Sequence, residues 1–304
     1  MKKYTKLLAA LLALALVFSF AGCRKDSGKK GPITVTDMTG RTITLDHPAE
    51  KVVALSAADC DIVYAVGAFD TLIGRGEMCD YPEQVKDLPS VQSGYNTNTE
   101  EIVKLAPEVL IMSTMAQTQE QVDALEAAGI KVVVSDAQDI EGIYTSIELI
   151  GAVTGHAEDA AKVVADMKKA FDDLKAQVKG DGTETVYFEV SPLKWGLWSA
   201  GSGTFMNELA EMMGVKNIFA DQQGWIQVSE EQVIERAPDY IVTITMSSGE
   251  GDDPVAEILG RPGWEHIPAV ENKKILNAPN NELTRPSQRL VEGAQMFYDF
   301  IYGK

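Results

Sequence analysis

AEDAAKVVADMKKAFDDLKAQV, at residues 157–178, is the stretch that decides the fold. It contains no glycine or proline, and Gly180 and Gly182 follow directly after it. Its apolar residues recur at spacings of three and four, which is typical of a helix with one buried face. These apolar positions are Ala160, Val163, Val164, Met167, Phe171 and Leu174. We therefore expect one long helix near the middle of the chain.

Short apolar runs alternate with helical stretches on both sides of this helix. Brief β-branched runs between helices are typical of buried parallel strands, so the alternation predicts an α/β fold. The expected strands are residues 51–55 (KVVAL), 72–74, 109–112, 131–134 (KVVV), 185–190, 240–244 and 274–276, with a hairpin at 33–45. The other expected helices are residues 59–66, 205–213 and 288–302.

An internal repeat relates the two sides of the long helix. Residues 100–111 read EEIVKLAPEVLI, and residues 231–242 read EQVIERAPDYIV. Each segment predicts a helix, capped by Asn98 or Ser229, that ends at a proline before a buried strand. The alternative is a coincidence between two ordinary αβ units. The repeat favours two similar Rossmann-like lobes joined by the long helix.

The first 23 residues are typical of a secretion signal. Three early lysines precede an apolar run at residues 7–20, which is shorter than the roughly 20 residues of a spanning helix. Ala21-Gly22-Cys23 resembles a bacterial lipobox, in which a lipid is attached to the cysteine and the chain is cut before it. The alternative is an ordinary signal peptide with an incidental cysteine. A lipobox predicts a mature chain that begins at Cys23, outside the cytoplasm, and is tied to a membrane by lipid.

The composition is that of a folded protein with an acidic surface. The chain of 304 residues is 45% hydrophobic and carries a formal net charge of −18. Such a charge repels phosphate groups, so we expect no nucleic-acid partner, and we expect the lipid rather than charge to attach the protein to the membrane. The expected parts are a signal peptide at 1–22, a lipidated N-terminus and tether at 23–32, an N-terminal α/β lobe at 33–156, a linking helix at 157–179 and a C-terminal α/β lobe at 180–304.

Two cysteines, Cys60 and Cys79, remain after the signal. Outside the cytoplasm such a pair can oxidise to a disulfide, and the alternative is two separate buried thiols. The spacing does not decide between these, because a disulfide also needs the two side chains to meet. No Cys-x-x-Cys is present, which excludes zinc ribbons and thioredoxin-type sites.

Catalytic signatures are missing from the sequence. It has no Gly-x-Ser-x-Gly elbow, no His-Glu-x-x-His and no P-loop. The histidines, His47, His156 and His266, lack the spacing of metal ligands. We therefore expect no enzyme, no metal site and no cofactor.

Aromatic residues cluster in the loops that follow strands or precede helices. In open α/β sheets such loops surround the crevice where ligands bind, and aromatic rings there offer a flat apolar surface to a large ligand. Arg285 is expected either to bind an acidic ligand group or to pair with the acidic surface. The aromatic candidates are Tyr81, Tyr95, Trp195, Trp198 and Trp225.

From about residue 51 to residue 302, the chain resembles the substrate-binding proteins of ABC importers for iron–siderophore, haem and vitamin B12, a class III periplasmic binding protein family. The resemblance implies two lobes bridged by one helix and ligand capture without chemistry. The motifs that carry it are KVVALSAADCDIVYAVG at 51–67, Cys79-Asp80-Tyr81-Pro82, residues 98–111, AGSGTFMNELAEMMGVKNIFA at 200–220, Gln227-Val228-Ser229 and Arg285-Pro286.

The resemblance also implies a partner. Proteins of this family present one glutamate per lobe to arginines of the membrane permease, and the matching positions here are Glu100 and Glu211. We thus expect a lipid-anchored extracytoplasmic receptor that binds a metal chelate and delivers it to an ABC permease. A ferric siderophore, a corrinoid and haem remain open as the chelate. The rival hypotheses are a receptor for a free divalent metal ion and, less favoured, an exported hydrolase.

Overall fold

The computed structural model describes residues 31–94, 96–114, 118–245 and 253–303. Both lobes belong to one compact unit, Pro32–Lys304. The signal segment with Cys23, and also Tyr95, therefore lie outside the described residues. In the part that is described, no helix is both long and apolar enough to span a membrane.

The N-terminal lobe is built on a five-stranded parallel sheet with the strand order β5-β4-β3-β6-β7. Its strands are β3 (Val52–Ala54), β4 (Leu72–Gly76), β5 (Ser90–Val91), β6 (Val109–Met112) and β7 (Lys131–Val134). Its helices are α2 (Ala57–Ala65), α3 (Thr99–Leu105), α4 (Gln119–Ala127) and α5 (Ile140–Thr154). The expected hairpin forms from β1 (Ile33–Thr36) and β2 (Thr42–Leu45), which pair antiparallel.

The C-terminal lobe has a four-stranded parallel sheet with the order β10-β8-β12-β13 and a separate two-stranded antiparallel ribbon, β11-β9. The sheet strands are β8 (Thr185–Glu189), β10 (Lys216–Asn217), β12 (Tyr240–Thr245) and β13 (Ile275–Pro279), and the ribbon strands are β9 (Trp198–Ala200) and β11 (Trp225–Gln227). The helices are α7 (Phe205–Met212), α8 (Glu230–Arg236), α9 (Pro254–Leu259), α10 (Pro268–Glu271), α11 (Asn280–Thr284) and α12 (Leu290–Tyr302). The prediction of an α/β fold with two lobes is confirmed.

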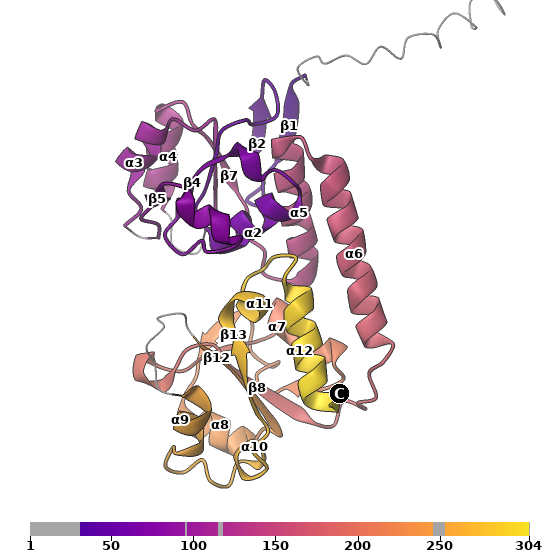
Figure 1. Cartoon of the computed structure of the whole chain (residues 1–304). Helices are drawn as coiled ribbons and strands as arrows, with labels where there is room; N and C mark the ends of the chain where they lie inside the picture. Colours follow the sequence, from indigo (N-terminus) through magenta and orange to yellow (C-terminus); the bar gives the residue numbers. More distant parts are fainter. Residues whose placement is uncertain (1–30, 95, 115–117, 246–252, 304) are drawn as a thin grey trace, which may run out of the picture. The chain divides into compact units, whose positions relative to one another are not determined.

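The expected long helix forms as α6 (Ala157–Lys175), which packs against α5 and α12 (Figure 1). Five of its six apolar positions are buried, and Val163 is half-buried. The apolar core that α6 joins contains residues of both sheets, for example Val109 of β6 and Phe188 of β8. The two lobes therefore share one continuous core beside α6. The proposed domain boundaries themselves stay a prediction.

Helix α5 was not predicted, because two glycines and several β-branched residues interrupt its helical pattern. Gly151 explains the interruption, since a Cβ atom there would lie 2.4 Å from the Cβ of Ala160. The glycine therefore lets α5 approach α6 closely, at a cost in helix propensity.

The internal repeat is real at the level of structure. Helices α3 and α8 are both seven residues long, and each ends at an alanine in the left-handed conformation, with φ of 52° at Ala106 and 41° at Ala237. A proline follows each alanine and leads into a central strand, β6 or β12. Ser229 and Gln232 form a complete capping box, while the Asn98 side chain accepts a hydrogen bond from the Glu101 N–H.

Candidate functional site

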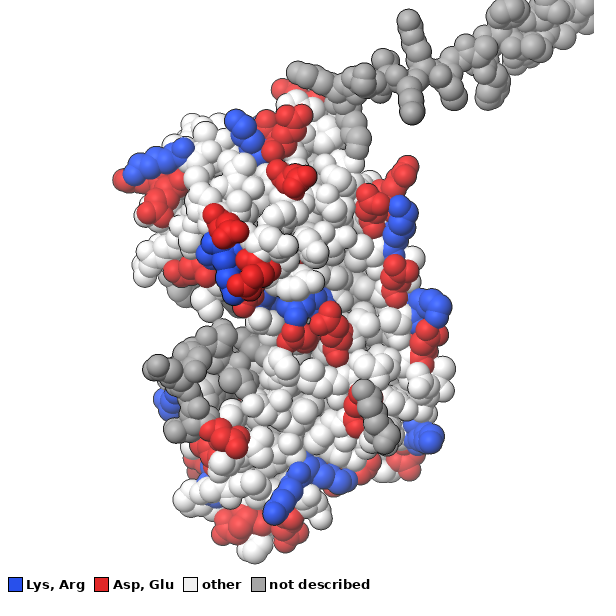
Figure 2. Space-filling view, in the orientation of Figure 1, with Lys and Arg blue, Asp and Glu red and all other residues white. Residues whose placement is uncertain are grey.

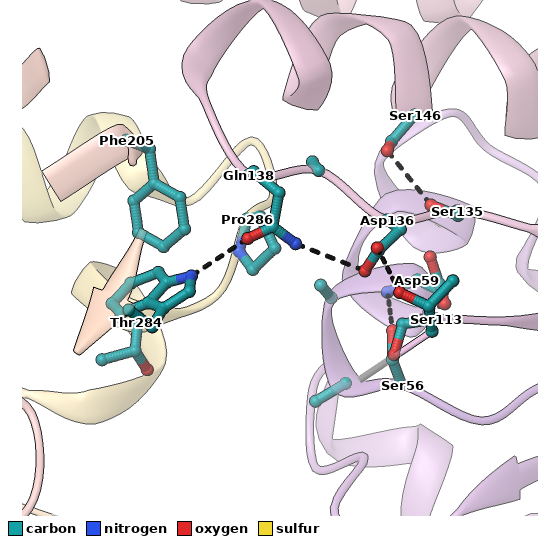
Figure 3. A pocket seen from close by; sticks show the side chains of 15 residues that line it. Ser56, Asp59, Ser113, Ser135, Asp136, Gln138, Ser146, Phe205, Thr284 and Pro286 are labelled. Carbon is teal, nitrogen blue, oxygen red and sulfur yellow. Dashed lines mark hydrogen bonds between the residues drawn. The ribbon is translucent and has the colours of Figure 1, made fainter. Parts of the chain in front are cut away.

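A cavity of about 270 Å³ lies between residues of the two lobes (Figure 3). The N-terminal lobe contributes residues that directly follow β3, β6 and β7, the carboxyl ends of three parallel strands, where ligands bind in open α/β sheets. The C-terminal lobe contributes the other wall through aromatic and small side chains. The N-terminal wall consists of Ser56, Ala57, Ala58, Asp59, Ser113, Thr114, Ser135, Asp136, Ala137, Gln138 and Ser146, and the C-terminal wall of Phe205, Trp225, Thr284 and Pro286.

Two carboxylates, Asp59 and Asp136, line the N-terminal wall. Asp59 is fully buried in the first turn of α2, where its Oδ2 accepts a 2.6 Å hydrogen bond from the Ser56 hydroxyl. Burial raises the pKa of Asp59 to about 6, and the nearby charge of Asp136 adds to this, although the hydrogen bond from Ser56 opposes it. A buried carboxylate with a raised pKa beside a cavity is typical of a functional site.

A chain of hydrogen bonds crosses the cavity between the lobes. The Trp225 indole N–H donates to Gln138 Oε1 at 3.0 Å, and the Gln138 amide lies 3.5 Å from Asp136 Oδ1. The Thr114 hydroxyl donates to Asp136 Oδ2. The backbone N–H of Phe205, whose ring packs edge-on against Trp225, donates to the Gln138 carbonyl at 2.8 Å. Gln138 thus connects the aromatic wall to the acidic wall.

A partly buried ion network links the lobes beside the cavity. Arg285 Nη1 lies 2.7 Å from Asp80 Oδ1 and 3.5 Å from Asp61 Oδ1. Arg289 Nη1 lies 4.0 Å from Asp61 Oδ2, and the Arg289 guanidinium covers the Tyr81 ring at 4.3 Å from its centroid. Two arginines of the C-terminal lobe therefore meet two aspartates and a tyrosine of the N-terminal lobe.

The two aspartates of this network differ in pKa. Burial raises the pKa of Asp61 to about 7, against the opposing charges of Arg285 and Arg289. Burial also acts on Asp80, but its hydrogen bond and charge interaction with Arg285 outweigh it and hold the Asp80 pKa below the usual value. Arg285 is therefore committed chiefly to Asp80.

Of the predicted ligand residues that the structure describes, only Trp225 lines the cavity, and 36% of its surface is exposed. Trp198 and Trp195 are 40% and 54% exposed and lie outside the lining residues. Tyr81 and Arg285 lie in the ion network, so the salt-bridge alternative for Arg285 is present in the structure. A ligand role for these four residues, and for Tyr95, stays a prediction.

Trp198 nevertheless faces the same way as Trp225. In the β9–β11 ribbon Trp225 pairs with Ala200, and Trp198 lies two residues before Ala200. Directly paired residues share a face of a ribbon, and so do residues two apart along a strand. Trp198 therefore extends the aromatic face that begins at Trp225.

The remaining predicted residues occupy separate places. Cys60 and Cys79 are buried free thiols, each within 4 Å of the Ala54 carbonyl oxygen, at 3.7 and 3.8 Å. A disulfide between them stays a prediction. Glu100 is exposed in the first turn of α3, and Glu211 is exposed near the end of α7, where it accepts a 2.8 Å hydrogen bond from the Asn207 amide.

Basic side chains on the surface lie next to acidic ones. On the face shown in Figure 2, lysines and arginines are interspersed with aspartates and glutamates. Examples among the ion pairs are Lys86 with Glu83, Lys162 with Asp159 and Lys169 with Asp173. Over the described ranges there is also no group of three or more His, Cys, Asp or Glu side chains arranged to hold a metal ion.

Sequence reasoning missed Asp59, Asp136, Gln138 and Phe205. For Asp136 a signal was present, because Ser135-Asp136 directly follows the buried strand KVVV, just as Ser113-Thr114 follows β6. Polar residues at the carboxyl ends of adjacent parallel strands meet at one edge of the sheet. Asp59 gave no such signal, since Ser-x-x-Asp before an apolar run is also the ordinary pattern of a helix cap.

Comparisons with known proteins agree with this architecture. Residues 52–282 match the family model described as periplasmic binding protein. The chain is 33% identical to an uncharacterized ABC transporter substrate-binding lipoprotein of Bacillus subtilis, covering 99% of this chain and 98% of the relative. It is 28% identical to a vitamin B12-binding protein of Vibrio campbellii, covering 80% and 86%. A crystal structure of a possible iron-binding (periplasmic solute-binding) protein from Staphylococcus epidermidis matches with a TM-score of 0.70 and 29% identity, covering 84% and 99%.

We predict that Asp59→Asn makes folding stability less sensitive to rising pH. The Asp59 pKa is about 6 in the folded protein, against a usual value of 3.8. Its contribution to stability is therefore complete below the usual value and is lost as pH rises through 6. The difference corresponds to roughly 3 kcal/mol. Urea unfolding from about pH 4 to about pH 7.5 should show the variant gaining free energy of unfolding relative to wild type, by up to that amount.

Asp166→Asn, which removes an exposed carboxylate from α6, is the matched control and should follow the wild-type profile. Parallel pH profiles for wild type and Asp59→Asn would contradict the view that this buried carboxylate destabilises the protein at neutral pH.

Proposed function

Because the chain belongs to the periplasmic binding protein family, as a substrate-binding protein of an ABC transporter, we propose that it captures a metal chelate between its lobes and delivers it to the permease. The observation that carries the proposal is the cavity between the lobes. Its polar wall comes from the carboxyl ends of β3, β6 and β7, and its aromatic wall comes from Phe205 and Trp225. An aromatic and apolar surface with a few placed polar groups is what a large organic complex needs.

The size of the cavity supports a ligand that is only partly enclosed. A volume of about 270 Å³ lies just below the range of ordinary ligand pockets, which starts near 300 Å³. A corrinoid, a haem or a ferric siderophore would extend beyond it. The shared ribbon face of Trp225 and Trp198 offers the next aromatic surface, with Trp195 further along the same segment. We assign the stacking contacts of the chelate to these three tryptophans.

Tyr81 and Arg285 take a different role in this proposal. Both belong to the ion network between the lobes, so they hold the two walls at a fixed separation around the ligand. Binding without catalysis agrees with the relatives, which are binding proteins. The rival receptor for a free divalent metal ion would place its ligands on the acidic wall alone and would leave the tryptophans without a part in binding.

Delivery and location complete the proposal. The exposed Glu100 of one lobe and Glu211 of the other would meet basic residues of the permease, and two separated contacts would set orientation as well as attraction. A lipid on Cys23 would hold the protein on the outer side of the cytoplasmic membrane or in the periplasm. The likeness to a substrate-binding lipoprotein supports the lipid anchor.

We predict that Trp225→Ala weakens binding of the chelate by several-fold to about tenfold, because an aromatic contact contributes about 0.5–1.5 kcal/mol beyond area burial. The loss should be smaller for Trp198→Ala and Trp195→Ala, since their rings lie outside the cavity wall. Isothermal titration with cyanocobalamin, haem and ferric siderophores measures the series. An unchanged affinity in Trp225→Ala would contradict the assignment of a stacking contact to Trp225, and an equal loss in all three variants would contradict its leading role.

Reversal of charge at Glu100 and Glu211 should impair delivery and leave capture intact. In the double variant Glu100→Lys and Glu211→Lys we expect wild-type ligand affinity with reduced uptake into cells and reduced association with the permease. Glu148→Gln, an exposed change on α5, is the control. If the double variant stays folded but loses ligand affinity, these glutamates belong to the binding site and the docking proposal is wrong.

Lipid attachment can be tested at one residue. Cys23→Ala should shift the protein from the membrane fraction to soluble or unprocessed forms. Processed protein that still sediments with membranes would rule out the lipid on Cys23.

A further inference from the structure

We propose that the acidic wall of the cleft selects a neutral or positively charged chelate whose N–H groups face Asp136 and Asp59, and that it rejects anionic chelates. This inference rests on the proposed function and specifies the chemical class of its ligand. The starting observation is that both carboxylates line the cavity, on the wall opposite Phe205 and Trp225.

Four polar side chains of the cavity lining already donate their hydrogen bonds to other residues. The Ser56 hydroxyl donates to Asp59, the Thr114 hydroxyl to Asp136, and the Ser135 hydroxyl to Ser146 at 3.1 Å. The Trp225 indole N–H donates to Gln138. What these groups still offer a ligand is acceptor capacity. A ligand face rich in N–H groups complements such a wall, and a face rich in oxyanions does not.

Asp136 is the centre of this acceptor surface. The described residues supply it with two side-chain donors, Thr114 and Gln138, and the Gln138 contact is long at 3.5 Å. An ionised carboxylate accepts about four hydrogen bonds, so Asp136 can take further donors from a ligand. Its side chain is half-buried at the cavity, where solvent screens a charge less than at an open surface.

The positive charges near the cleft are committed elsewhere. Arg285 is paired with Asp80 and lies near Asp61, and Arg289 is paired with Glu282 and lies near Asp61. Neither arginine is among the residues that line the cavity. The carboxylates of haem or the oxyanions of a catecholate siderophore would therefore face Asp59 and Asp136 without a compensating cation on the described wall.

The aromatic wall favours the same charge class. Trp225 and Phe205 pack edge-on, with ring centroids 5.5 Å apart, and Trp225 keeps a partly exposed surface. The face of an indole attracts cations and tolerates neutral apolar groups. A cationic or neutral complex would thus be stabilised from both sides of the cleft.

Four chelates of different charge test the inference. Ferrioxamine B is cationic, cyanocobalamin is neutral, and haem and ferric enterobactin are anionic. Each is titrated by calorimetry into wild type, Asp136→Asn, Asp136→Lys and the exposed control Asp166→Asn, with thermal unfolding to verify that each variant folds. A comparison of the affinities for ferrioxamine B and cyanocobalamin distinguishes a hydroxamate-type siderophore from a corrinoid.

We expect wild type to prefer ferrioxamine B or cyanocobalamin over both anionic chelates. Asp136→Asn should weaken the preferred chelate by about 10- to 100-fold, the effect of a hydrogen bond to a charged group. Asp136→Lys should weaken it further and strengthen the anionic chelates, and Asp166→Asn should match wild type. Preference of wild type for an anionic chelate, or no effect of Asp136→Asn, overturns the charge assignment while the proposed function stands. If none of the four binds, the proposed function fails together with this inference.

Discussion

The packing of α6 against both lobes is the constraint on which the rest of the structure depends. Its buried face joins a core that includes strands from both sheets, and Gly151 of α5 allows the close approach this packing needs. The ion pairs of Arg285 and Arg289 with Asp80 and Asp61 add a second connection beside the cleft. Because the lobes are held in two places, we expect the cavity between them to be largely formed before a ligand binds, which would lower the ordering cost of binding.

The carboxylates near the cleft differ in their partners. Asp61 and Asp80 face arginines from the opposite lobe, so their charges help to hold the lobes together. No arginine or lysine charge offsets the raised pKa of Asp59, which burial and the charge of Asp136 produce. A buried charge without a cation lowers stability at neutral pH, and its position on the cavity wall gives a reason for keeping it.

Periodicity and local signals made much of the fold predictable. The expected strands at β6 and β7 and the start of α6 agree with the structure, and the Ala-Pro repeat marks equivalent positions in both lobes. Helix α5 was not predicted, because Gly151 lowers the local helix propensity. This glycine is needed instead for the close packing of α5 against α6. The site was harder to predict from the sequence, because position in a loop alone does not show that Trp225 lines the cavity and that Trp195 does not. The pairing of Arg285 with Asp80, 205 positions apart, depends on tertiary structure.

The central claim, that the cleft retains a metal chelate, is tested most directly by the visible spectrum of the wild-type protein. The protein is incubated with cyanocobalamin, haem or a ferric siderophore, freed of excess ligand by gel filtration and measured beside a sample treated with zinc. The account predicts that the absorbance band of at least one chelate elutes with the protein in stoichiometric amount. Colourless protein in every chelate sample, with zinc retained in the other, would contradict it and favour a receptor for free metal ions.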